Sequence, residues 1–187
     1  MTWFWKLLLQ ILGWKPASEA NFPHHLKKAV VAIAPHTSNW DFIICLAYRY
    51  ALNLNNARFL GKAELFKPPF GFLFRWWGGT PVDRFSKHNM VDQVVDRINA
   101  TEHFILGISP EGTRKKVDRL RTGFYHIAKA ANIPIVLGAL DFEKKQLYFG
   151  EPFFASDDEE ADIKKIIAFY AAVKGKVPEN GLAHLIN

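Results

Sequence analysis

The chain alternates short apolar runs with segments in which apolar residues recur at helical spacing. The short runs predict buried strands at residues 29–34, 58–61, 104–108 and 133–140, with a hairpin partner at 146–149. The helical spacing predicts helices over residues 40–52, 87–100, 121–131 and 160–174. Because strands alternate with helices, the pattern predicts a single-domain α/β sandwich with a mostly parallel central sheet flanked by helices.

Residues 1–14 are a separate apolar segment that predicts an N-terminal interfacial helix. Such a helix is ~18 Å long, too short to cross ~30 Å of hydrocarbon. Its aromatic residues suit the headgroup zone of a bilayer, so membrane contacts are expected at Trp3, Phe4, Trp5 and Trp14. A helix packed on its own domain is the alternative, and a signal peptide fits less well because Lys6 interrupts the apolar stretch. Residues 15–27 are then expected to form a linker and residues 28–187 the domain itself.

Composition adds a basic, aromatic character to this picture. The net charge is +6, and the 187 residues include six Trp and sixteen Phe. That balance suits an anionic membrane, a phosphate-bearing substrate or nucleic acid. The most aromatic stretch, residues 66–77, adds expected membrane contacts at Phe72, Trp76 and Trp77. A single cysteine, Cys45, excludes an intramolecular disulfide and a cysteine-based zinc site.

His36 and Asp41 are the first candidates for chemistry. His36 follows a predicted strand, and Asp41 lies in the first turn of the helix that Ser38 or Asn39 can cap. A carboxylate at that position can hold one imidazole nitrogen, so that the other acts as a base on an alcohol. Taken alone, the pair also fits a capping histidine and an acidic residue that satisfies the helix dipole.

The second candidate is the segment Glu111-Gly112-Thr113-Arg114, which follows another predicted strand. Gly112 permits a tight turn whose amides can face an anion, and Arg114 offers a planar fork of donors for phosphate. Arg84 similarly ends an extended segment after two glycines. The alternatives are a solvated turn for the first segment and a surface ion pair for Asp83 and Arg84. No glycine-rich nucleotide loop and no serine-hydrolase elbow occur in the sequence.

Together these motifs resemble the glycerophospholipid acyltransferases, the family of 1-acyl-glycerol-3-phosphate acyltransferases, and the short length resembles a compact bacterial branch. Residues 36–41 are similar to the family's H-x-x-x-x-D block, residues 78–84 to its second block, residues 110–114 to its third and residues 133–136 to its fourth. The chain departs from the family pattern at Pro35, Thr80, Pro81 and Ser109. The departures at Thr80 and Pro81 leave the identity of the acceptor open.

The resemblance implies transfer of a fatty acyl group from acyl-CoA or acyl-carrier protein to a lysophospholipid hydroxyl. It implies His36 as the base and Asp41 as its orienting partner, with no metal and no cofactor. It implies phosphate contacts at Arg84, Glu111, Gly112, Thr113 and Arg114, and an acyl region at Ile133, Pro134 and Ile135. With the basic N-terminal segment, it implies a peripheral enzyme on the cytoplasmic face of an anionic membrane. The alternatives are another lysolipid or amino-acid-lipid acceptor and, more remotely, a non-catalytic lipid- or nucleic-acid-binding module; no nucleic-acid partner is expected.

Overall fold

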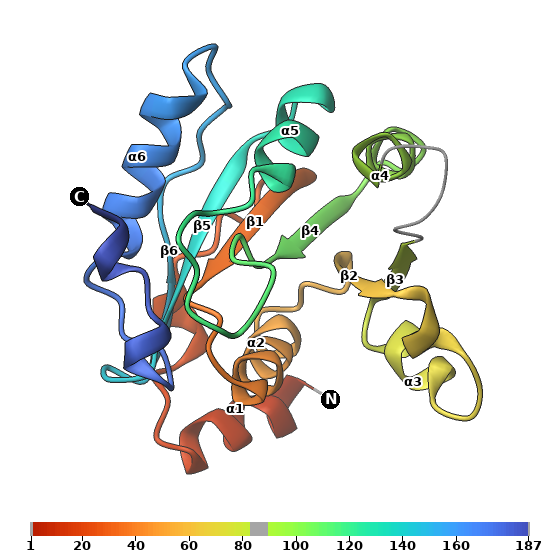
Figure 1. Ribbon diagram of the computed structural model, residues 1–187. Coiled ribbons are helices and arrows are strands. Elements are labelled where there is room, and N and C mark those ends of the chain that lie inside the picture. The colour runs from red at the N-terminus through yellow and green to blue at the C-terminus, as the bar shows by residue number, and fades with distance from the viewer. Residues whose placement is uncertain (1, 83–89, 187) are drawn as a thin grey trace.

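The computed structural model describes residues 2–82 and 90–186, which form an α/β sandwich around one sheet (Figure 1). The strands are β1 (Lys28–Ala34), β2 (Ala57–Lys62), β3 (Gly79–Val82), β4 (Phe104–Ile108), β5 (Ile135–Asp141) and β6 (Gln146–Phe149). Their order across the sheet is β3-β2-β4-β1-β5-β6, and all neighbours are parallel except β5 and β6. The predicted fold class, with its mostly parallel sheet, is therefore confirmed.

Helices cover both faces of the sheet. One face carries α1 (Thr2–Ile11) and α2 (Asn39–Ala51), and the other carries α4 (Met90–Asn99), α5 (Gly123–Ala130) and α6 (Glu159–Tyr170) (Figure 1). The short helix α3 (Gly71–Trp76) lies beside the edge strand β3. Side chains of β1 alternate between the layers: Val31 packs under α1 and α2, whereas Val30 and Ala32 pack under the other helices. Burial on both sides explains why β1 is apolar from Ala29 to Ala34.

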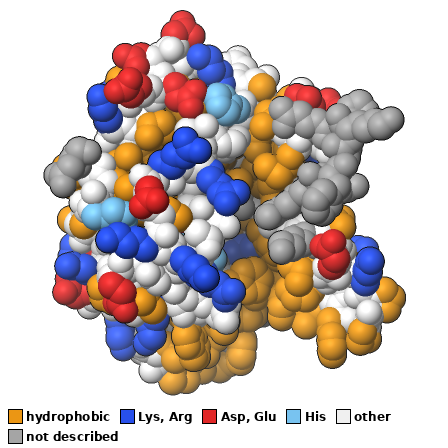
Figure 2. Space-filling view, viewed as in Figure 1, with side chains coloured by type: hydrophobic (Ala, Val, Ile, Leu, Met, Phe, Trp, Pro, Cys, Tyr) orange, Lys and Arg blue, Asp and Glu red, His pale blue; other side chains and the backbone are white. Residues whose placement is uncertain are grey.

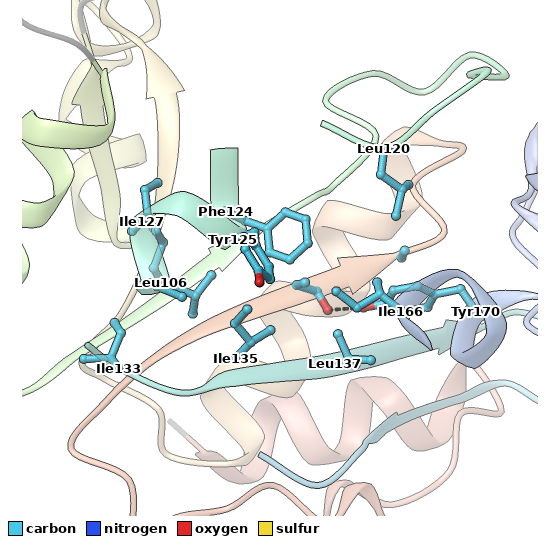
Figure 3. Packing of buried hydrophobic residues seen from close by; sticks show 14 of the residues in the cluster. Leu106, Leu120, Phe124, Tyr125, Ile127, Ile133, Ile135, Leu137, Ile166 and Tyr170 are labelled. Atoms are coloured by element: carbon cyan, nitrogen blue, oxygen red, sulfur yellow. Dashed lines mark hydrogen bonds between the residues drawn. The ribbon is translucent and has the colours of Figure 1, made fainter. Parts of the chain in front are cut away.

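The fourth predicted block lies in the buried core. Figure 3 shows Ile133 and Ile135 among the side chains that pack between the sheet and helices α5 and α6. Ile133 is 6% exposed, Ile135 is fully buried, and Pro134 between them is also buried. None of the three lines the large cavity described below. The expected acyl region at Ile133, Pro134 and Ile135 therefore stays a prediction, on residues that the structure places in the core.

The N-terminal helix is half core and half surface. Leu9 and Trp14 are buried, and the Trp14 ring meets the Phe142 ring edge-on at 4.9 Å. Trp5 stacks on Tyr50 of α2 at 5.0 Å, while Trp3 and Phe4 stay exposed. Trp14 thus packs within the domain, where a membrane contact was expected.

The segment that follows is also packed, where a linker was expected. Residues Ala17–Ala20 form a 3₁₀ turn in which Ala17 and Ala20 are buried, and Phe22 joins the same core. The Tyr48 hydroxyl donates to the carbonyl of Lys15 at 2.7 Å. No helix in the described part of the chain is long and apolar enough to span a bilayer.

Candidate active site

The predicted catalytic loop, with His36, and the predicted phosphate-binding loop, with Glu111, lie side by side because their strands are neighbours. His36 follows β1 and Glu111 follows β4, and β1 pairs with β4 in parallel register. The helices that leave these strands, α2 and α5, cover opposite faces of the sheet. Such a divergence opens a crevice at the carboxyl ends of the strands, where α/β proteins bind their ligands.

His36 and Asp41 form the pair that their spacing predicts. The His36 Nδ1 lies 2.9 Å from the Asp41 Oδ2, and Asp41 is only 3% exposed. A carboxylate can only accept, so Nδ1 carries the proton and donates it to Asp41. In the neutral imidazole with this tautomer, the other ring nitrogen, Nε2, carries the lone pair that a base needs.

Local hydrogen bonds fix this loop. The Ser38 side chain caps α2 by accepting from the Trp40 amide, and the Asp41 Oδ2 accepts from the amides of Thr37 at 2.6 Å and Ser38 at 2.8 Å. The capping arrangement stabilises the helix start and orients the carboxylate toward His36. Asp41 therefore has both of the roles that the sequence suggested: it completes the helix cap with Ser38, and it is the partner of His36.

Glu111 holds the catalytic loop from the neighbouring strand. Its carboxylate accepts from the His36 amide at 2.6 Å and from the Ser109 hydroxyl at 2.8 Å. Glu111 is 1% exposed, and burial raises the pKa of its carboxyl group even though these hydrogen bonds lower it. Both carboxylate oxygens are thus engaged within the protein, and they tie the loop after β4 to His36. The predicted phosphate contact at Glu111 stays a prediction.

Arginines provide the positive charge around His36. Arg114, together with Gly112 and Thr113, lines the cavity at the site, as do Arg58 and Arg121. Gly112 has φ +65°, and a Cβ there would lie 2.7 Å from Arg121, so the turn requires glycine. Arg84 lies outside the described residues. Arg58 was not among the residues predicted to bind phosphate. In the sequence, it stands out only as a basic residue within the apolar run that forms β2.

A cavity of about 910 Å³ runs from His36 between α2 and the sheet. Its polar lining comes from the loops and arginines described above. Its apolar lining includes Phe42 and Cys45 from α2, Ile33 from β1 and Phe149 from β6. Burial and the nearby Asp41 charge raise the pKa of the Cys45 thiol to about 12. Its thiolate is therefore too scarce near neutral pH to serve as a nucleophile.

The expected membrane contacts near this cavity divide into two sets. Phe72 and Trp76 of α3 are 69% and 56% exposed. Trp77 is half-buried, and its ring lies 5.9 Å from that of Phe42 at the cavity wall.

A C-terminal segment, residues 174–186, braces both loops, and the sequence analysis did not identify it. The Val177 amide donates to the Thr37 hydroxyl at 3.1 Å, and Gly175 packs against Thr37 with no room for a Cβ. The Asn180 side chain donates to the Arg114 carbonyl at 3.1 Å. The His184 Nε2 lies 2.8 Å from the Val117 carbonyl. The segment therefore ties the loop after β1 to the loop after β4.

Comparison with known proteins agrees with this geometry. A family model described as Acyltransferase matches residues 17–137, more than half of the chain and inclusive of both loops. The fold is similar to that of the crystal structure of the 1-acyl-sn-glycerophosphate (LPA) acyltransferase, PlsC, from Thermotoga maritima. That similarity has a TM-score of 0.56 and 17% sequence identity over 94% of this chain and 80% of that one. A search of curated proteins found no match. The chain belongs to the acyltransferase family.

Proposed function

We propose that this protein transfers a fatty acyl group from an acyl thioester to the hydroxyl of a lysophospholipid. The preferred acceptor is 1-acyl-glycerol-3-phosphate, which would give phosphatidate. The observation that carries the proposal is the His36–Asp41 pair, at 2.9 Å, on a cavity lined by both arginines and apolar side chains. A phosphate next to a long alkyl chain matches both kinds of lining. The Thermotoga maritima protein of similar fold is itself a 1-acyl-sn-glycerophosphate acyltransferase, which supports this class of acceptor.

In the proposed reaction, His36 acts as a general base in one direct transfer. Its Nε2 takes the proton of the acceptor hydroxyl as the oxygen attacks the thioester carbonyl. The resulting imidazolium is stabilised by the Asp41 carboxylate at Nδ1. The tetrahedral intermediate then collapses, the carbon–sulfur bond breaks, and the departing thiolate takes the proton from Nε2. The products are an ester and a free thiol, and no acyl-enzyme, metal or cofactor is needed.

The arginines are proposed to hold the acceptor phosphate beside His36. Arg58, Arg114 and Arg121 line the cavity. The planar fork of a guanidinium group suits bidentate contacts with phosphate. The apolar wall under α2 is proposed to take an alkyl chain. Acyl-CoA and acyl-carrier protein both remain donors to be tested.

We further propose that the protein attaches peripherally to the cytoplasmic leaflet. Exposed aromatic side chains project from α1 (Trp3 and Phe4) and from the α3 region (Phe70, Phe72 and Trp76). Tyr50 connects the two helices, since its ring stacks on Trp5 and lies 6.5 Å from Trp76. Figure 2 shows hydrophobic side chains gathered along the lower edge, where these helices lie. Such a contiguous apolar surface suits a bilayer interface.

Acyl transfer by the purified protein tests this function. Palmitoyl-CoA and palmitoyl-acyl-carrier protein would be offered with lysophosphatidate and with a panel of other lysolipids. Transfer to lysophosphatidate that falls at least 10²-fold in His36→Ala is the expected result. Transfer only to another lysolipid would retain the mechanism and refute the acceptor. A folded protein that transfers to none of them would refute the proposal.

A further inference from the structure

A second cavity, of about 540 Å³, lies on the opposite side of α2 from the proposed reaction site. Trp40 and Ile44 of α2 line it, whereas Phe42 and Cys45 of the same helix line the larger cavity. Its other walls come from the end of the α1 region, the β5–β6 turn and residues 174–178. The second cavity thus has no lining residue in common with the His36 site, and none of the proposed reaction steps uses it.

The walls of this second cavity are basic. Lys145, Lys174 and Lys176 line it, and among the residues that the structure describes Glu143 is the one acidic lining residue. The Lys145 ammonium donates to the carbonyl of Leu12 at 3.0 Å, and that of Lys176 lies 6.0 Å from the Phe142 ring. Within the part of the chain that the structure describes, Lys174 and Lys176 have no carboxylate partner. Their charges are therefore available to an anion.

Apolar side chains share the lining of this cavity with the lysines. Leu12, Trp14 and Phe142 line it, and Trp40, which also lines it, is 48% exposed. Figure 2 shows Lys and Arg side chains beside the apolar lower edge of the molecule. Lysines beside apolar lining residues match a lipid whose phosphate is anionic and whose chains begin next to it.

We propose that the second cavity binds the phosphate headgroup of an anionic membrane phospholipid. The inference rests on the proposed function only in placing the protein at a membrane. The exposed ring of Trp40 and the apolar lining residues Leu12 and Phe142 favour a lipid over the nucleotide end of a thioester donor, which carries no alkyl chain at its phosphates. A bound headgroup would touch residues 174–178, the segment that contacts Thr37 of the catalytic loop through Val177.

Vesicle flotation with a charge-matched control tests this site. Lys174→Gln/Lys176→Gln removes the two cavity lysines, and Lys164→Gln/Lys165→Gln removes two exposed lysines of α6. A lysine near an anionic surface contributes ~1 kcal/mol, or about five-fold in affinity. The cavity variant should bind vesicles of phosphatidylcholine with phosphatidylglycerol about 25-fold more weakly than wild type, and pure phosphatidylcholine vesicles equally. Equal losses in the two variants would overturn the proposal, since the lysines would then act only through net charge.

Soluble probes separate the possible sources of phosphate. Monomeric dihexanoylphosphatidylglycerol should bind the wild type, and the cavity variant should lose that binding event. If glycerol 3-phosphate binds as tightly as this short lipid, the apolar lining residues contribute nothing to the affinity, and the membrane-lipid assignment is wrong. If adenosine 3′,5′-bisphosphate loses affinity for the cavity variant while vesicle binding stays unchanged, the cavity serves the donor and the proposal fails.

Acyl transfer by the wild type in detergent is measured separately from lipid binding. If no acyl transfer is detected, the proposed function is refuted. The vesicle and short-lipid results then decide whether the second cavity binds a headgroup.

Discussion

Replacing Asp41 by asparagine would separate the charge of the carboxylate from its geometry. The Asp41 Oδ2 accepts three hydrogen bonds, from the His36 Nδ1 and from the amides of Thr37 and Ser38. The two amides can only donate, so the asparagine must place its own oxygen at that point. That oxygen still accepts from the His36 Nδ1, so the histidine tautomer is kept and only the negative charge is lost.

The structure sets the size of the expected effect. A hydrogen bond to a charged group contributes ~1.5–3 kcal/mol, against ~1 kcal/mol for a neutral pair. The difference of about 0.5–2 kcal/mol matters when His36 becomes protonated during the reaction. Asp41→Asn should therefore lower kcat about 2- to 30-fold and leave KM for the acceptor unchanged. Asp41→Ala removes the acceptor altogether and should cost about 10²–10⁴-fold.

Thermal unfolding controls for damage to the fold. The amide nitrogen of Asp41→Asn would occupy the place of Oδ1, which is buried and has no hydrogen-bond partner among the described residues. An unsatisfied buried donor costs ~1–3 kcal/mol, which lowers the Tm of a chain this size by about 2–4 °C per kcal/mol.

Steady-state kinetics at 25 °C on the folded variants then decide the matter. If Asp41→Asn is as inactive as Asp41→Ala, the backbone amides do not orient the side chain as argued. If Asp41→Asn is fully active, the carboxylate does not stabilise the protonated histidine.

Three further predictions address the loops and the membrane surface. Burial raises the pKa of Glu111 above 4.5. The stability that protonated Glu111 contributes is therefore fully present below pH 4.5, and it falls as the pH rises through the raised pKa. Urea unfolding should show the advantage of wild type over Glu111→Gln shrinking from pH 4 to pH 8, and a constant difference would contradict the burial argument. Asn180→Ala removes the bond to the Arg114 carbonyl, so KM for a phosphate-bearing acceptor should rise about 2- to 12-fold; an unchanged KM would show that the C-terminal segment does not position Arg114. Phe72→Ser should weaken vesicle binding about 10-fold. Phe154 is 61% exposed on another segment, so Phe154→Ser should leave vesicle binding unchanged. Equal effects of the two variants would exclude α3 as a membrane contact.

The fold and the His36–Asp41 pair were predictable because both depend on local patterns. Apolar periodicity identifies the strands and helices, and the five-residue spacing places Asp41 in the first turn of α2. The contact between His36 and Glu111 depends instead on β1 lying next to β4. Strand order is decided by packing across the whole sheet, so the motifs predict that both loops share an edge but not that they touch.

Roles within buried segments were harder to predict. The run that became β5 is buried along its whole length, and without polar alternation the sequence does not show which face meets a cavity. The expected acyl region at Ile133, Pro134 and Ile135 therefore rests only on the resemblance to the family's fourth block. The bond from Val177 to Thr37 spans 140 residues and arises from one backbone amide, which leaves no trace in residue type.

The N-terminal helix illustrates why composition alone could not separate a core helix from an interfacial one. Both need apolar and aromatic residues, and α1 satisfies both needs at once. Leu9 and Trp5 pack inward, and Trp3 and Ile11 remain more than 70% exposed. The inward set attaches α1 to α2, the helix that begins with the Asp41 turn. A membrane contact on the outward set would therefore hold α2, and with it the proposed catalytic pair, at a fixed distance from the bilayer surface.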